Sequence, residues 1–136
     1  MNTYVDSSTL LRVVLKEPGA PSSWSRISMP ISSELIRVEC LRTVDRARLR
    51  LSLHDDEVAR LRSELLEAIE SFVLIELDGR VKSRASEPFP TLLGTLGAIH
   101  LASALLAREQ FTDLRFTTQD RELQIAARSV GFAVLA

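Results

Sequence analysis

The sequence has few of the residues that build disulfides, metal fingers and membrane spans. Cys40 is the single cysteine among 136 residues, which excludes an intrachain disulfide and a cysteine-based zinc motif. No apolar run is long enough to span a membrane, and Asp6 stands where a signal peptide would need its apolar core. These features predict a cytoplasmic protein that is not associated with a membrane.

An excess of one charge and a stacking array of aromatic residues are also missing. The net charge is −1, so nucleic acid binding would have to rest on a local basic patch. Aromatic residues make up 5% of the chain, and Trp24 and Phe89 stand alone rather than in an interleaved pattern for stacking bases. A glycine-rich phosphate loop is absent too, which counts against one alternative function, a phosphatase or phosphotransferase of small molecules.

What is present predicts one globular α/β domain over residues 1–136. The hydrophobic fraction is 46% and the charged fraction 26%, and the length suffices for a real core. Short apolar segments alternate with helical periodicity, which predicts a small, mainly parallel sheet between two layers of helices. The predicted strands cover residues 3–6, 27–31, 72–75, 114–117 and 132–135. The predicted helices, with serine caps at Ser7 or Ser8 and at Ser32 or Ser33, cover residues 8–16, 32–50, 55–70, 78–86, 92–108 and 120–129.

Three acids lie beside predicted strand ends or helix starts: Asp6, Glu39 and Asp120. Ligands of open α/β sheets bind at the carboxyl edge of the strands, where such acids would gather. Gathered carboxylates repel one another and are usually neutralised by a cation such as Mg²⁺, which supports phosphodiester hydrolysis. Taken singly, each acid also fits a helix cap, a turn or a solvated helix position. Spacing alone favours that simpler interpretation.

Four segments favour the metal-site interpretation of these acids, because together the segments resemble those of PIN-domain proteins. They are Tyr4–Leu11, Ser33–Glu39, Thr95–Leu105 and Phe116–Leu123, followed by Ala126, Ala127 and Gly131. The segments cover nearly the whole chain in the order of the family. In size, the chain resembles the toxin branch, the VapC-type ribonucleases of toxin–antitoxin pairs.

The resemblance implies a three-layer PIN-like α/β/α fold and Mg²⁺- or Mn²⁺-dependent cleavage of RNA. It also implies a cognate antitoxin protein as partner, RNA as substrate and a homodimer. By this likeness Asp6, Glu39 and Asp120 match the metal-binding and catalytic acids of the family. Ser8 and Thr118 match the polar residues that support the metal site.

Gly97 departs from the family pattern. The residue before Ala-Ile-His-Leu-Ala is normally a metal-binding aspartate, whereas glycine offers no ligand and costs about 1 kcal/mol relative to alanine inside a helix. Either the domain is degenerate, or the aspartate was lost or removed because an active toxin selects against its own expression. In both cases we expect weak metal binding and slow or absent RNA cleavage. The alternative function is a catalytically inactive PIN-like protein that binds an antitoxin or RNA.

The remaining candidates are basic residues and two side chains near the acids. A ridge that contacts RNA phosphates is predicted from Arg12, Lys16, Arg37, Arg42 and Arg46, although a solvated helix face explains the same charges. His100 lies three residues after Gly97, and we expect it to be packed with a backbone partner. Cys40 is expected to be a small buried hydrophobe.

Overall fold

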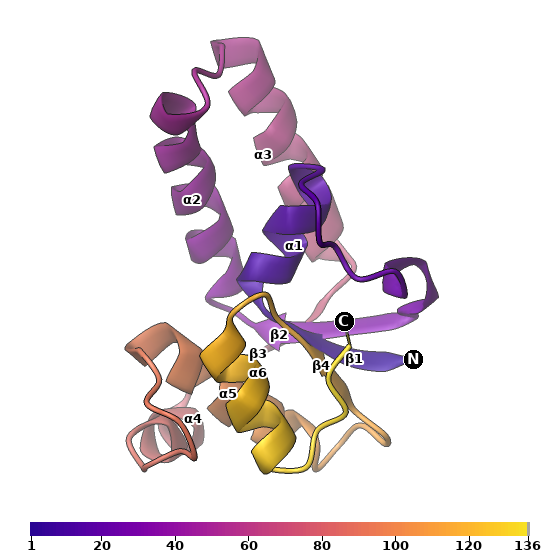
Figure 1. Ribbon diagram of the computed structural model, residues 1–136, viewed down its shortest axis with the longest axis vertical. Helices are drawn as coiled ribbons and strands as arrows, with labels where there is room; N and C mark the ends of the chain where they lie inside the picture. Colours follow the sequence, from indigo (N-terminus) through magenta and orange to yellow (C-terminus); the bar gives the residue numbers. More distant parts are fainter. Residues whose placement is uncertain (136) are drawn as a thin grey trace.

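The computed structural model describes residues 1–135, which form a four-stranded sheet, six α-helices and one short 3-10 helix (Figure 1). The strands are β1 (Asn2–Val5), β2 (Met29–Ser33), β3 (Val73–Ile75) and β4 (Arg115–Thr117). The helices are α1 (Ser7–Val14), η1 (Trp24–Arg26), α2 (Ile36–Arg50), α3 (Asp55–Glu70), α4 (Gly79–Ala85), α5 (Thr95–Ala107) and α6 (Arg121–Ser129). The predicted α/β class is confirmed.

The sheet is parallel throughout residues 1–135 and has the strand order β3-β2-β1-β4. β1 lies in the interior, where Tyr4 pairs with Ile31 of β2 and with Phe116 of β4. At the carboxyl end of β1, the Asp6 amide donates to the carbonyl of Thr117 at 3.0 Å. The ends of β1 and β4 are therefore adjacent, as parallel pairing requires.

The helices form two layers, with α1, α2 and α3 on one face of the sheet and α4, α5 and α6 on the other (Figure 1). Successive strand residues point to opposite faces. Tyr4 therefore joins the core that includes Leu101 and Leu123, whereas Val5 joins the core that includes Ile36 and Leu65. This arrangement is the predicted three-layer α/β/α fold. None of the helices in residues 1–135 combines the length and apolar character needed to cross a membrane.

The connections after β1 and β4 leave the sheet in opposite directions. β1 leads into α1 on one face, and β4 leads into α6 on the other (Figure 1). Ligands of open α/β sheets bind beside such a switch of direction, at the carboxyl ends of the strands. Asp6 and Thr118 follow these two strands directly, so the fold places both residues at that edge of the sheet.

Some of the predicted elements and caps were wrong in detail. The predicted final strand over 132–135 is reduced to one bridge between Phe116 and Val134, just after Gly131 turns the chain with φ of +100°. The second strand runs two residues further than predicted, so Ser32 and Ser33 are buried in β2 and do not cap α2. Similarly, Asp6 rather than a serine occupies the N-cap position of α1, and α5 begins at Thr95, after Gly94 at its N-cap position.

Candidate metal centre

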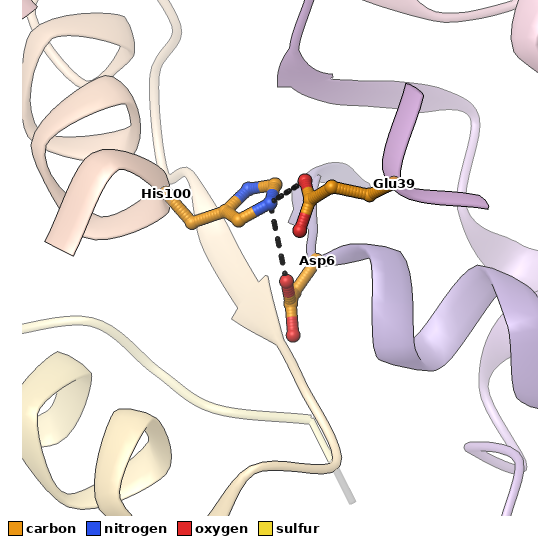
Figure 2. A group of neighbouring side chains, drawn as sticks. All are labelled: Asp6, Glu39 and His100. Atoms are coloured by element: carbon orange, nitrogen blue, oxygen red, sulfur yellow. Dashed lines mark hydrogen bonds and ion pairs between the residues drawn. The ribbon is translucent and has the colours of Figure 1, made fainter. Parts of the chain in front are cut away.

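Asp6, Glu39 and His100 meet at the carboxyl edge of the sheet (Figure 2). Asp6 is the N-cap of α1, Glu39 lies in the first turn of α2, and His100 comes from α5 on the opposite layer. Each side chain offers a metal-binding atom, and these atoms lie within 4.8 Å of one another. Residues distant in sequence thus form one compact group of two carboxylates and an imidazole.

The imidazole of His100 faces both carboxylates. Its Nε2 atom lies 2.6 Å from Oε1 of Glu39 and 3.4 Å from Oδ1 of Asp6 (Figure 2). His100 is 1% exposed and Asp6 is 6% exposed, so little water screens these charges. Burial alone lowers the pKa of His100, but the hydrogen bond with Glu39 and the charges of Asp6 and Glu39 outweigh it and raise that pKa.

Hydroxyl groups hold the two carboxylates in place. Ser8 and Thr118 each donate to Oδ2 of Asp6 at 2.6 Å, and Ser7 donates to Oε2 of Glu39 at 3.2 Å. Such hydrogen bonds fix the orientation of a carboxylate. Ser8 and Thr118 thus occupy the positions that a supporting role requires. Ser7 was not identified from the sequence, because neither a motif nor a spacing distinguishes it from Ser8.

Tyr4 completes the surroundings of His100 on the other side of the ring. Its hydroxyl lies 2.8 Å from Nδ1 of His100, and the two rings pack edge to face with centroids 5.8 Å apart. Burial, followed by the nearby Asp6 charge, raises the pKa of Tyr4, so the hydroxyl stays neutral. His100 is packed, as expected, but the prediction of a backbone partner was wrong. Both ring nitrogens face side chains instead.

Asp120 lies outside this group of three. Its Oδ1 accepts hydrogen bonds from the amides of Glu122 and Leu123 at 2.9 and 3.2 Å, which caps α6. The residue is exposed, and its own amide donates to Oγ1 of Thr118 at 3.1 Å. Asp120 is therefore connected to Asp6 through Thr118, and its carboxylate performs the capping role that the simpler interpretation assigned. A metal-binding role for Asp120 stays a prediction.

Gly97 is the third residue of α5, one helical turn before His100. A Cβ atom at this position would lie 3.8 Å from Cβ of Leu93, which is an ordinary van der Waals contact. The backbone there is helical and does not have the positive φ that favours glycine. Nothing in the surroundings of Gly97 therefore requires a glycine, and an aspartate side chain can be placed there without a clash at its first atom.

A groove of about 270 Å³ runs along α2 beside Glu39. We call it the α2 groove. Its wall includes three apolar residues, Leu35, Val38 and Leu96, and two cations, Arg42 and Arg46. Val38 is 58% exposed and Leu96 is 50% exposed, so the groove presents an unusually apolar surface next to a carboxylate.

The other predicted basic residues surround the site less closely. Arg37 is exposed on α2, in the first turns that also carry Glu39. On α1, Arg12 donates to the carbonyl of Pro18 at 2.6 Å, and Lys16 follows the helix with φ of +55°. The structure therefore brings Arg42 and Arg46 to the α2 groove, whereas Arg12 lies on α1 and Lys16 lies just beyond its end.

Cys40 follows Glu39 but belongs to the apolar core. The residue is fully buried among the side chains of α1, α2 and α3. Burial, then the charges of Glu39 and Asp6, raise the pKa of the thiol, so a thiolate is disfavoured. The expectation of a small buried hydrophobe is met.

Comparison with known proteins identifies the family of this chain. Ribonuclease VapC46 of Mycobacterium tuberculosis (strain ATCC 25618 / H37Rv) is 33% identical over 137 aligned positions, which cover 98% of this chain and 95% of the relative. The chain belongs to the VapC family of PIN-domain toxins. No family model matches the sequence. Membership of the VapC family confirms the predicted resemblance and agrees with the fold described above.

The donor set of the candidate metal centre fits a divalent cation. Buried carboxylates without a cation partner would repel each other, and here they share one imidazole and several hydroxyl donors. Oxygen ligands suit Mg²⁺ and Mn²⁺, and imidazole suits transition ions. Asp6 and Glu39 would hold the ion, with His100 close enough to take part.

Proposed function

We propose that this chain is a toxin of a toxin–antitoxin pair, a Mg²⁺- or Mn²⁺-dependent endoribonuclease that is impaired by Gly97. The observation that supports it most is the convergence of buried Asp6 and partly buried Glu39 in one group at the carboxyl edge of the sheet. The family relationship adds support, because the relative is named as a ribonuclease. The α2 groove also places the positively charged side chains of Arg42 and Arg46 near Glu39.

Different residues of the site would have different roles in phosphodiester hydrolysis. When bound, the cation would polarise a phosphate oxygen and lower the pKa of a bound water. Asp6 and Glu39 hold the cation, and Ser8 and Thr118 keep Asp6 in its orientation. Asp120 is proposed as a third acid through Oδ2, because only Oδ1 is used in the cap.

Basic residues would bring the substrate to these acids. Carboxylates alone repel phosphate, so an RNA strand needs cations along its path. Arg42 and Arg46 lie in the α2 groove, and Arg37 lies on the same helix. Among residues 1–135, Arg42 is bonded only to exposed Asp45, and Arg46 donates to Thr43, so these exposed contacts can be exchanged for phosphate at little cost. We propose that Arg12 and Lys16 extend this path.

The α2 groove is also the proposed site of the cognate antitoxin. Its apolar wall suits an amphipathic segment, and Glu39 at its end suits an arginine or lysine of that segment. In the complex formed with the antitoxin encoded beside the gene, hydrogen exchange should slow in α1 and α2. Protection confined to α4 and α6 would contradict this placement. The expected homodimer is a further proposal, which analytical ultracentrifugation would test.

Cleavage assays on three matched proteins test the proposed activity. We expect the unsubstituted chain to cleave RNA slowly in Mg²⁺ or Mn²⁺, Gly97→Asp to cleave faster, and Gly97→Asp with Asp6→Asn to lose the gain. The double variant excludes a contaminating nuclease, and circular dichroism confirms that each protein is folded. If folded Gly97→Asp shows no more metal-dependent cleavage than the unsubstituted chain across varied RNAs, the proposed impairment is wrong.

The second candidate function is a non-catalytic protein that binds an antitoxin or RNA. Two observations favour it: Gly97 supplies no ligand, and one oxygen of Asp120 is engaged in a helix cap. Under this alternative, Gly97→Asp stays inactive while RNA or antitoxin still binds the α2 groove. Fluorescence anisotropy with labelled RNA, run beside the cleavage assay on the same proteins, separates the two functions.

A further inference from the structure

We propose that His100 is itself a metal ligand, through Nε2, and that Asp6, Glu39 and His100 together form a site that prefers Mn²⁺ to Mg²⁺. This inference deepens the proposed function, since it concerns the same cation site. Among residues 1–135, this is the one group of three potential metal ligands whose binding atoms lie within 4.8 Å. The imidazole thereby supplies a third ligand where Gly97 supplies none.

The first argument is the position of the ring. Nε2 lies 2.6 Å from Oε1 of Glu39 and 3.4 Å from Oδ1 of Asp6. Bond lengths near 2.1 Å place neighbouring ligands of an octahedral cation about 3 Å apart, between these two separations. Side-chain shifts of a fraction of an ångström would therefore bring Nε2 to the separation of neighbouring ligands from both carboxylate oxygens. Figure 2 shows the ring edge pointing between the two carboxylates.

The second argument is the partner of the other ring nitrogen. A metal-bound histidine commonly donates its second N–H to a neighbouring group, which fixes the tautomer and the ring orientation. Tyr4 provides such a group, because its buried hydroxyl lies 2.8 Å from Nδ1. When Nδ1 carries the proton and donates to this hydroxyl, the lone pair of Nε2 faces the carboxylates. A bound cation then replaces the proton that joins Nε2 to Glu39.

The third argument concerns the alternatives. His54 is the other histidine of the two in the chain, and it caps α3 at an exposed position outside the group. Asp120 lies outside the group as well, and its Oδ1 caps α6. His100 is 1% exposed and is held from both sides by side chains, which is the preorganisation that a ligand needs.

The ligand chemistry predicts the metal preference. Mg²⁺ favours oxygen ligands, whereas imidazole binds first-row transition ions more strongly. We therefore expect Mn²⁺ to bind at least about tenfold more tightly than Mg²⁺, with the nitrogen ligand as the cause. In Gly97→Asp, an added carboxylate should narrow that difference, because the new oxygen ligand serves both ions.

Pulsed electron paramagnetic resonance of bound Mn²⁺ tests the assignment directly. The unsubstituted chain should show modulation from a coordinated ¹⁴N nucleus, and labelling histidine with ¹⁵N should change its frequency without any substitution. His100→Asn removes Nε2 but keeps a polar atom near the position of Nδ1 for Tyr4. This variant should lose the nitrogen signal and bind Mn²⁺ roughly 10–100-fold more weakly. His54→Asn, the matched control, should retain both signal and affinity.

The outcomes distinguish this inference from the proposed function. Bound Mn²⁺ without nitrogen coupling overturns the role of His100 as a ligand and leaves a carboxylate-only metal nuclease intact. An isotope-sensitive signal that persists in His100→Asn also overturns it. Absence of Mn²⁺ binding up to millimolar concentration overturns the site as a whole, and the cleavage assays above then decide the activity separately. If His100→Asn fails to fold, the ¹⁵N shift in the unsubstituted and His54→Asn proteins still decides the assignment.

Discussion

Asp6 and Asp120 follow neighbouring strands, yet their surroundings differ sharply. Asp6 is 6% exposed, and its Oδ2 accepts hydrogen bonds from two hydroxyls, those of Ser8 and Thr118. Asp120 is exposed, and its Oδ1 accepts hydrogen bonds from two backbone amides of α6. Side-chain donors and burial hold the first carboxylate in one orientation, as the proposed metal site requires. The second contributes to helix stability whether or not a ligand is present.

Two sides of the candidate metal centre differ in the same way as Asp6 and Asp120. On one side, Asp6, Glu39 and His100 form a dense group with few exposed atoms. On the other side, Gly97 has no side chain, and Asp120 is directed to its own helix. An acid next to a strand end thus becomes part of a site only where neighbouring elements supply donors and exclude water. The predictions below test this difference.

The largest effect is expected at Asp6. In the Gly97→Asp background, Asp6→Asn should reduce metal-dependent RNA cleavage by at least about 100-fold, the upper end of the loss for groups that only support a ligand. The amide keeps the size of the side chain but binds cations poorly. Initial rates on a fluorescent RNA provide the measurement. A loss of less than a few-fold would show that Asp6 is not a ligand.

A smaller effect is expected at Tyr4, which supports His100 from behind. Tyr4→Phe keeps the ring but leaves Nδ1 of His100 buried without its partner. An unsatisfied buried donor costs about 1–3 kcal/mol, so the free energy of unfolding in urea should fall by that amount. The Mn²⁺ affinity of Tyr4→Phe is compared with that of Phe116→Leu, which changes a residue of the same core that has no polar contact to His100. Equal losses of affinity in both variants would argue against a specific role for the hydroxyl.

Substitution of Asp120 should have a smaller effect on cleavage, and it separates the capping of α6 from contact with the cation. Asparagine is about as good an N-cap as aspartate, so Asp120→Asn should leave the unfolding free energy nearly unchanged. If Oδ2 also contacts the cation, cleavage by the Gly97→Asp protein should fall about tenfold, as for other supporting groups. Asp120→Ala should in addition lose about 1 kcal/mol of stability with the cap. Unchanged cleavage in Asp120→Asn would confine this residue to capping.

The smallest effect concerns Cys40. Because burial and two nearby carboxylates raise its pKa, the native thiol should react with iodoacetamide far more slowly than in urea. Cys40→Ala should also leave nitrogen coupling to bound Mn²⁺ unchanged. Mass spectrometry of the alkylated protein checks the first expectation. Rapid modification in the native state would show that this part of the core opens readily.

Parts of this architecture could be predicted from sequence because they depend on local patterns. The helix over 55–70 has three acids in its first turn and buried residues at helical spacing, and its predicted bounds match α3. The convergence of Asp6 with Glu39 follows from strand ends that meet at one edge. Each of these features is encoded within a few neighbouring residues or in the order of the elements.

Other parts depend on tertiary contacts that no local pattern reveals. In the sequence, Tyr4 has the pattern of an ordinary strand residue. Only the packing of α5 against the sheet brings His100 to the hydroxyl of Tyr4. The partners of His100 therefore differ from the expected backbone group. The segment 132–135 has the composition of a strand but pairs only at Val134, beside the short strand β4.

Titration of Mg²⁺ into the unsubstituted chain and Gly97→Asp tests the central claim most directly, namely that an assembled site lacks one carboxylate. We expect Gly97→Asp to bind Mg²⁺ at least about tenfold more tightly, because position 97 has room for the side chain. Gly94→Asp, with the same charge at the N-cap of α5, should not reproduce the gain. Equal Mg²⁺ affinity in the folded Gly97→Asp and unsubstituted proteins, or an equal gain in Gly94→Asp, would contradict the claim.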